Sequence, residues 1–114
     1  MVEKNYCPER GDLIWLDFNP QSGHEQSGRR PALVISPKIY NLKVGLCLLC
    51  PITSKSKGYP FEVEVKGIMS LNGVILADQL KSLDWKARNA VFIANAKPET
   101  IDDVIELINT LICS

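Results

Sequence analysis

The most informative stretch of this chain is residues 23–31, with the sequence GHEQSGRRP. It places an acid, a histidine, an amide and two guanidinium groups between two apolar runs typical of strands, Leu13–Phe18 and Ala32–Ile35. A loop that only reverses the chain needs no more than Gly, Asn or Asp. Reactive side chains on a loop between two strands therefore indicate a candidate active site. The alternative is an ordinary solvent-exposed turn that happens to be rich in charge.

Two further polar segments follow apolar runs. Residues 53–60, TSKSKGYP, come directly after Leu46–Ile52 and combine hydroxyl and ammonium groups with a glycine, which suits a phosphate-binding loop. Tyr59 offers a surface on which a base can stack, and the GxxxxGK[ST] spacing of a Walker loop is absent. Residues 77–82, ADQLKS, interrupt the chain after the apolar residues 74–76. Each segment alone is more often a surface loop, and only their combination favours a functional site.

The elements that must position these loops are short strands, which the apolar runs and turn residues of the first two-thirds of the chain predict. The clean alternation of residues 61–65, FEVEV, predicts a strand with one buried and one solvent-facing side. A short helical turn is expected within Lys38–Gly45. The predicted strands are Asp12–Phe18, Arg30–Ser36, Leu46–Ile52, Phe61–Val65, Gly73–Leu76 and Leu80–Leu83, with a further extended piece near Val91–Ala94.

The end of the chain has a different period. After Pro98, apolar residues recur with the spacing of an amphipathic helix, at Ile101, Val104, Ile105, Ile108, Leu111 and Ile112. Pro98 suits the first helical position, and the acids that follow it favour the positive end of the helix dipole. Strands followed by one helix predict a mainly β fold, a small and strongly bent antiparallel sheet or barrel closed by a C-terminal helix. We expect residues 1–114 to form a single domain.

Composition indicates an ordinary globular protein, with 46% hydrophobic and 23% charged residues. No apolar run approaches the ~20 residues that span a bilayer, and the N-terminus lacks the apolar segment of a signal peptide, so a cytoplasmic location without membrane partners is expected. Net charge is zero, but residues 29–66 carry +5 whereas residues 1–28 and 97–114 each carry −3. A basic middle on a neutral chain fits a local phosphate-binding surface, although chance also produces such a distribution.

Four cysteines need an interpretation, because Cys47 and Cys50 have the CxxC spacing of redox and zinc sites. They lie within an apolar run that predicts a buried strand, where residues i and i+3 point to opposite faces. Two sulfur atoms on opposite faces neither share a metal ion nor form a disulfide easily. For these two cysteines, as for Cys7 and Cys113, we expect buried, reduced thiols.

The strand Asp12–Phe18 carries two aromatic residues whose roles depend on which face is buried. Alternation along the strand allows either one to enter the core. Core packing is the expected role of Trp15. Phe18 precedes the 23–31 loop, and we expect it at the rim of a binding groove.

In combination and in order, the motifs closely resemble the MazF/PemK family of toxin endoribonucleases over residues 10–112. The matching segments are Gly11–Trp15, Gly23–Ala32, Pro51–Ser54, Ser56–Val63, Ala77–Ser82 and Lys86–Arg88. The resemblance implies an SH3-like barrel of the plasmid-maintenance toxin type with a C-terminal helix, forming a homodimer. It implies sequence-specific, metal-independent cleavage of single-stranded mRNA without a cofactor, which inhibits translation and growth. It also implies a cognate antitoxin whose disordered acidic tail occupies the RNA site.

RNA cleavage without a metal has defined chemical requirements. A base removes the proton of the ribose 2′-OH, a cation or donor set stabilises the phosphorane, and an acid protonates the leaving 5′ oxygen. By resemblance, Glu25, Arg30 and Thr53 match the catalytic positions of the family. Arg30 is suited to clamp the phosphate with paired donors, and Thr53 to donate its hydroxyl. Glu25 is either the base or the group that holds Arg30 in place. The products would be 2′,3′-cyclic phosphate and 5′-hydroxyl ends.

One branch of the family uses a different set, a His before the Glu, an Arg, and an Asp two residues after that Arg. This chain supplies His24 and Asp78, but Leu76 stands where the arginine is expected. The second set is therefore incomplete. His24 titrates near neutral pH, and both His24 and Asp78 are possible assisting residues.

The remaining polar and aromatic side chains of the motifs are expected to contact RNA. These residues are Phe18, Gln26, Arg29, Ser54, Lys57, Tyr59, Gln79, Lys81 and Arg88. Arg29 is interpreted as either a solvated charge or a non-specific phosphate contact. Two other functions remain compatible with the same fold, a non-enzymatic toxin that poisons DNA gyrase and a module that only binds RNA or antitoxin.

Overall fold

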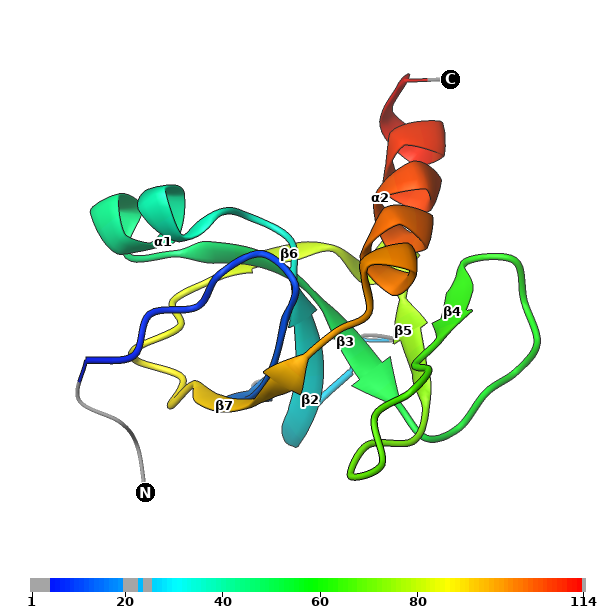
Figure 1. The fold of residues 1–114 in the computed structure, drawn as a ribbon, viewed down its shortest axis with the longest axis horizontal. Coiled ribbons are helices and arrows are strands. Elements are labelled where there is room, and N and C mark those ends of the chain that lie inside the picture. Colours follow the sequence, from blue (N-terminus) through cyan, green and yellow to red (C-terminus); the bar gives the residue numbers. More distant parts are fainter. Residues whose placement is uncertain (1–4, 20–22, 24–25, 114) are drawn as a thin grey trace.

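The computed structural model describes residues 5–19, 23 and 26–113 of the 114-residue chain (Figure 1). Its elements are β1 (Asp12–Asp17), β2 (Arg29–Val34), α1 (Lys38–Val44), β3 (Cys47–Thr53), β4 (Glu62–Glu64), β5 (Val74–Leu76), the 3-10 turn η1 (Ala77–Gln79), β6 (Lys81–Leu83), β7 (Val91–Asn95) and α2 (Pro98–Cys113). All seven expected strands, the short helix and the C-terminal helix are present. The predicted mainly β architecture with a C-terminal helix is confirmed.

The sheet is antiparallel and bends sharply at β3. Its order is β4-β5-β3-β2-β1-β7, and β6 pairs with β3 off this path. The first half of β3 pairs with β6 from Cys47 to Leu49, whereas Ile52 and Thr53 at its end pair with β5. One strand thus joins two parts of a strongly bent sheet, and the loops at the end of β3 meet the loop between β1 and β2.

Two groups of buried residues fill the interior, one on each side of the bent sheet. The first contains Leu13, Ile52 and Ile75, and α2 covers it with Val104 and Ile108. Figure 1 shows α2 standing beside β4 and β5, where it closes this side of the barrel. The second group lies on the other side and includes Ile14, Leu16, Phe18, Leu49 and Trp85. Both faces of β1 and β3 are therefore apolar over much of their length.

The cysteines follow the strand geometry. Cys47 belongs to the second buried group and Cys50 to the first, so their thiols lie on opposite faces of β3, as predicted. Burial raises the pKa of both thiols to about 12, which keeps them protonated. Cys7 is also a buried free thiol. The expectation of burial is wrong for Cys113, which is exposed because the last turn of α2 extends beyond the sheet.

Trp15 in β1 and Phe18 immediately after β1 occupy the reverse of the expected positions. Phe18 is 3% exposed and packs in the second buried group, so its predicted place at the rim of a groove is wrong. Trp15, expected in the core, is 38% exposed. The physical reason is that Ile14 and Leu16 lie on one covered face of β1, and Phe18, the residue after the strand, packs in the same buried group. The other face is covered only at Leu13 and opens to the surface at Trp15.

Within the part of the chain that the structure describes, neither helix combines the length and apolar character needed to cross a bilayer.

Candidate functional site

Three of the predicted loops meet at the end of β3 and line a pocket of about 250 Å³, which we call the Thr53 pocket. The loops are β1–β2, β3–β4 and the η1 turn. The pocket brings together six residues expected from the sequence, Gln26, Thr53, Lys57, Tyr59, Asp78 and Gln79. Lys55, Glu62 and Leu76 complete its lining. Three segments that are separate in the sequence thus form one site.

Thr53 is the buried hydroxyl of this pocket, only 7% exposed. Its Oγ1 accepts a hydrogen bond from the backbone N–H of Lys55 at 3.1 Å, which leaves the hydroxyl proton available to a ligand. The backbone of Gly73 lies close against Thr53, because a Cβ added at Gly73 would lie 2.5 Å from the Thr53 carbonyl oxygen. Position 73, immediately before β5, therefore requires glycine.

Tyr59 and Asp78 connect the β3–β4 loop to η1. The Tyr59 hydroxyl donates to Asp78 Oδ1 at 2.7 Å. Burial, followed by the hydrogen bond and the negative charge of Asp78, raises the pKa of Tyr59 to about 12, so this phenol remains a donor at neutral pH. The backbone N–H of Gln26 donates to Gln79 Oε1 at 3.3 Å and ties the β1–β2 loop to the same turn.

Glu62 organises the lysine-rich β3–β4 loop. Its carboxylate accepts hydrogen bonds from the N–H of Lys57 at 2.8 Å, the N–H of Gly58 at 3.0 Å and the hydroxyl of Ser56 at 2.7 Å. These bonds, first of all the one from the Lys57 backbone, hold the pKa of Glu62 below its usual value. The carboxylate thus shapes a loop whose Lys55 and Lys57 side chains are exposed and able to meet an anion.

Arg30 lines a second pocket of about 540 Å³ on the other side of the β3 end, which we call the Trp15 pocket. Its Nε donates to the carbonyl oxygen of Ser27 at 2.6 Å, and its terminal nitrogens have no partner among the described residues. Because Ala32 lies opposite Pro51 in the antiparallel β2–β3 register, Arg30 lies at the same end of the sheet as Thr53. The remaining lining residues are Trp15, Ser27, Gly28, Arg29, Pro31, Ile52, Ser54, Ser70, Leu71 and Asn72.

Arg29 and Arg88, both expected to contact RNA, brace the base of the β1–β2 loop. Arg29 Nη1 forms an ion pair with Asp17 Oδ1 at 2.9 Å, and its Nη2 donates to the Asn89 carbonyl oxygen at 2.9 Å. Arg88 Nη1 donates to the carbonyl oxygens of Asp17 at 3.1 Å and Asn19 at 2.9 Å. The two adjacent arginines therefore differ, because the terminal nitrogens of the exposed Arg29 donate to protein acceptors, whereas those of Arg30 have no partner among the described residues.

Three predicted residues do not join either pocket. Phe18 lies in the core, and Lys81 lies in β6 opposite Leu49, where it lines neither pocket. Arg88 lines neither pocket. Glu25 and His24, predicted as the catalytic acid or base and as a possible assistant, lie outside the described residues.

Three residues that line the two pockets were not among the site residues expected from the sequence, namely Lys55, Trp15 and Asn72. Lys55 could have been found, since it belongs to the same hydroxyl- and lysine-rich run as Thr53 and Lys57. Trp15 was assigned to the core, and Asn72 has no local signal because only the fold brings its loop beside β2.

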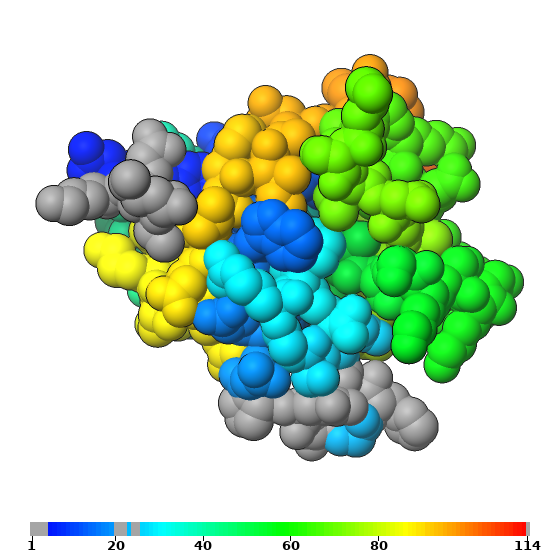
Figure 2. All heavy atoms as spheres, turned by 90° about the horizontal axis from the view of Figure 1, so that it is seen from below, coloured from blue at the N-terminus to red at the C-terminus, as the bar shows by residue number. Residues whose placement is uncertain are grey.

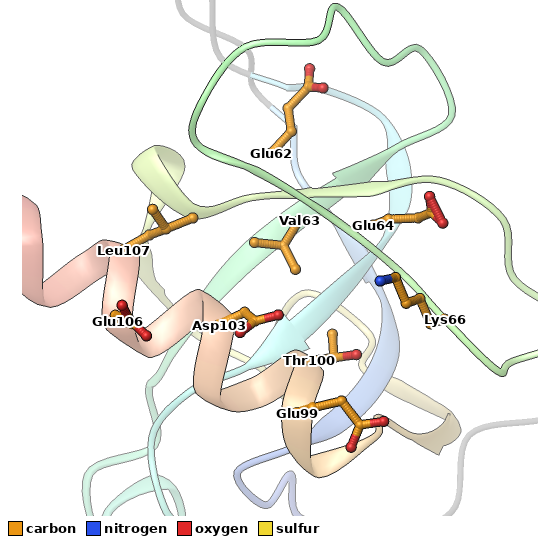
Figure 3. Close-up of a pocket in the computed structure, with 9 residues that line it drawn as sticks. All are labelled: Glu62, Val63, Glu64, Lys66, Glu99, Thr100, Asp103, Glu106 and Leu107. Atoms are coloured by element: carbon orange, nitrogen blue, oxygen red, sulfur yellow. The ribbon is translucent and has the colours of Figure 1, made fainter.

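A third hollow, of about 410 Å³, lies between β4 and α2 and is lined mainly by carboxylates (Figure 3). Figure 3 shows Glu99, Asp103 and Glu106 along α2, with Glu62 and Glu64 across from them on β4. Lys66 is its one cationic lining residue, and Val63, Thr100 and Leu107 complete it. We call this hollow the acidic groove. Its charge is unsuited to a polyanion.

Among residues 5–19, 23 and 26–113, no three His, Cys, Asp or Glu side chains are grouped so that they could hold a metal ion.

Comparison with known proteins gives the family. The sequence model described as "PemK-like, MazF-like toxin of type II toxin-antitoxin system" matches residues 9–112. The endoribonuclease toxin MazF of Escherichia coli K12 is 51% identical over 107 residues, which cover 94% of this chain and 96% of that protein. The endoribonuclease toxin ChpB of the same organism is 36% identical over 113 residues, covering 92% and 93% of the two chains.

Solved structures agree with this result. The crystal structure of MazF from Deinococcus radiodurans superposes with a TM-score of 0.92 at 47% identity, covering 96% of this chain and all of that one. A MazE–MazF structure from the same organism gives a TM-score of 0.85 at 48% identity, over 95% of this chain and 97% of the other. By family match, sequence identity and fold, the chain belongs to the PemK-like, MazF-like toxins of type II toxin–antitoxin systems.

Proposed function

We propose that this chain is an endoribonuclease toxin that cleaves single-stranded mRNA at short sequence motifs and so inhibits translation and growth. The observation that carries the proposal is the 51% identity to the Escherichia coli endoribonuclease MazF over almost the whole chain. The pocket beside Thr53 supports it, because cationic, hydroxyl and amide groups line the pocket together with an aromatic ring. The whole chain acts as a single toxin domain in the cytoplasm.

The chemistry proposed is a transesterification, in which the ribose 2′ oxygen replaces the 5′ oxygen on phosphorus. The ribose 2′-OH loses its proton to a base and its oxygen attacks the adjacent phosphorus. The bond to the 5′ oxygen then breaks, and that oxygen takes up a proton. The products are a 2′,3′-cyclic phosphate and a 5′-hydroxyl. Glu25 is proposed as the base or as the residue that orients Arg30.

Arg30 and Thr53 are proposed to stabilise the phosphorane. The terminal donors of Arg30 make no hydrogen bond or ion pair with another described residue, so we propose that they form a fork to two phosphate oxygens. The Thr53 hydroxyl oxygen accepts a hydrogen bond from the Lys55 backbone, and the hydroxyl can donate its proton to a phosphate oxygen. Asp78 is proposed to act by holding Tyr59 beside the RNA, and His24 as a possible assistant.

The proposed partners are a second copy of the chain and a cognate antitoxin. The antitoxin's disordered acidic tail would lie over the same cationic loops as the RNA backbone, beside Arg30, Lys55 and Lys57, and would exclude RNA by competition. The +5 charge of residues 29–66 supports this mode of neutralisation.

The test is digestion of a mixed-sequence RNA in the presence of EDTA, with mapping of the cut ends. We expect cleavage at a short motif that leaves 5′-hydroxyl ends. An absolute need for magnesium together with 5′-phosphate ends would overturn the chemistry. Retention of RNA without any cut would indicate a binding module, and inhibition of gyrase without cleavage would indicate the gyrase poison.

A further inference from the structure

Trp15 is an aromatic side chain that the fold leaves open to solvent. It lies in the middle of β1, opposite Pro31 of β2 and Val91 of β7, yet 38% of its surface is exposed. Its neighbours Ile14 and Leu16 are fully buried. An indole left exposed on a sheet surface, beside a pocket, is a common anchor for a ligand. Trp85, the other tryptophan, is instead buried and donates to the Asn41 carbonyl oxygen at 3.0 Å.

The Trp15 pocket surrounds this indole with polar groups of the kind that recognise a base. Arg30 contributes a guanidinium, Ser54 a hydroxyl and Asn72 a side-chain amide, while Pro31 and Leu71 supply apolar walls. A volume of about 540 Å³ falls within the range of pockets that hold small organic groups. Figure 2 shows this face, where β1 (blue) lies between β7 (orange) and β2 (cyan), bordered by residues 66–72 in light green.

The two pockets are arranged for a chain that passes over the end of β3. Ile52 and Ser54 line the Trp15 pocket, whereas Thr53 between them lines the Thr53 pocket. Each pocket also has an aromatic residue, Trp15 in one and Tyr59 in the other. A phosphate held between Arg30 and Thr53 would have one neighbouring nucleotide on each side.

We infer that the Trp15 pocket is a nucleobase subsite for the RNA strand, in which the Trp15 indole stacks on one base and the Asn72 amide contacts the edge of that base. The inference rests on the proposed function and adds the residues that help to select the sequence motif. Stacking on an aromatic ring suits any base, so the edge contact of Asn72 supplies the discrimination.

The test uses an RNA that carries the mapped cleavage motif and a 2′-deoxy nucleotide at the cut position, so that the strand binds without reacting. The fluorescent base 2-aminopurine replaces each nucleotide beside the cut in turn. We expect quenching on binding at one position, and loss of that quenching in Trp15→Ala. Dissociation constants should rise roughly 5- to 150-fold in Trp15→Ala, with Trp15→Phe retaining most of the affinity.

The matched control is Phe92→Ala, which removes another exposed aromatic residue from the neighbouring strand β7. Phe92 is 42% exposed, packs against the Tyr6 ring in a tilted arrangement and lines neither pocket, so its removal should leave affinity and quenching unchanged. Asn72→Ala lies in a loop outside the strands and should broaden the cleaved motif while the melting temperature stays the same. It therefore tests the subsite even if Trp15→Ala fails to fold.

Equal affinity and quenching in wild type and Trp15→Ala would overturn the subsite while leaving the proposed endoribonuclease intact, provided that wild type still cuts RNA. A Trp15→Ala protein that changes from dimer to monomer in light scattering would also overturn it, because the indole would then be a contact between copies. Failure of wild type to cut any RNA would contradict the proposed function instead, and a comparison of wild type and Trp15→Ala in their affinity for mixed-sequence RNA would then still test the pocket.

Discussion

The loop face, formed by the Thr53 and Trp15 pockets, and the acidic groove are hollows on the same bent sheet with opposite charge. The loop face contains Arg29, Arg30, Lys55 and Lys57, and the acidic residues lining it are Asp78 and Glu62. The acidic groove is lined by five carboxylates and Lys66. At about 410 Å³ the groove is larger than the Thr53 pocket at about 250 Å³. The Trp15 pocket of the loop face is larger than both, at about 540 Å³, so volume does not separate the two regions. Charge does, and it favours the loop face as the proposed RNA site, because RNA is a polyanion.

The two regions also differ in how their polar groups are supported. On the loop face, hydrogen bonds between segments hold each loop in place, as Tyr59 does with Asp78 and Gln26 with Gln79. In the groove, Glu99, Asp103 and Glu106 follow one another along the solvent-facing side of α2 and make no hydrogen bond to β4 among the described residues. A supported set of donors is pre-organised for a ligand, and a solvated helix face is not.

The loop face and the acidic groove should differ most in how the rate of RNA cleavage responds to the removal of one cationic side chain. Arg30→Ala is expected to lower the rate of RNA cleavage ~10²–10³-fold, because it removes donors to the phosphorane. Lys66→Ala changes the net charge equally but lies in the acidic groove, and its rate should stay within about twofold of wild type. Cleavage of the mapped motif is followed under single-turnover conditions. Similar losses in both variants would show that the effect is one of overall charge.

Arg30→Lys separates charge from geometry in the same assay. It keeps the positive charge and loses the planar fork, so most of the Arg30→Ala defect should remain. Arg29→Ala should cost far less activity than Arg30→Ala, because the contacts of Arg29 are to Asp17 and Asn89. A larger loss in Arg29→Ala would mean that the two adjacent arginines have exchanged roles.

The second test uses two buried threonines, one in each region. Thr53 is 7% exposed and Thr100 is 3% exposed, and each lines its own hollow. Thr53→Val should lower cleavage roughly 10- to 100-fold, which corresponds to one lost hydrogen bond to a charged oxygen. Thr100→Val preserves the shape of the groove and should leave cleavage unchanged. Circular dichroism and thermal melting check that both variants fold, and equal activities would remove Thr53 from the proposed mechanism.

The strands, the final helix and the loops of the site could be predicted because their signals are local. The alternation of residues 61–65 gives β4, and the apolar spacing after Pro98 gives α2. The loop motifs are contiguous, so Thr53, Lys57, Tyr59 and Asp78 could be named before their pocket was known. Such features depend on neighbouring residues, which the sequence shows directly.

The positions of Trp15 and Phe18 could not be predicted, because both faces of β1 are apolar. In the folded sheet Trp15 lies opposite Pro31 of β2 and Val91 of β7, and these pairings between distant segments cannot be read from the sequence of β1. The different roles of Arg29 and Arg30 also could not be predicted, because they depend on contacts between distant segments. Arg29 lies opposite Asp17 in the β1–β2 register, and this pairing is a long-range property.

The salt dependence of RNA affinity should also differ between the loop face and the acidic groove, with a smaller effect than in the preceding tests. Lys57→Gln is expected to reduce the slope of log affinity for RNA against log salt by about 0.7, the value for one phosphate contact on a single strand. Its defect should therefore shrink about threefold between 50 and 200 mM salt. Asp103→Asn in the acidic groove should leave the slope unchanged, since Asp103 lines neither the Thr53 pocket nor the Trp15 pocket. The slope is measured with the non-cleavable RNA, and parallel lines for wild type and Lys57→Gln would exclude a phosphate contact.

The smallest expected effect concerns Glu62, the carboxylate that lines both the Thr53 pocket and the acidic groove. Hydrogen bonds from the Lys57 backbone, Ser56 and Gly58 lower the pKa of Glu62 from 4.5, so its contribution to stability is present above that value and disappears as the pH falls through the lowered pKa. The melting temperature of Glu62→Gln should accordingly lie slightly below that of wild type at pH 6, and the two should converge in acid. Glu64→Gln, which removes a neighbouring carboxylate of the groove, should show no such convergence. A Glu62→Gln melting curve that stays parallel to wild type from pH 6 to pH 3 would mean that the carboxylate does not hold the β3–β4 loop.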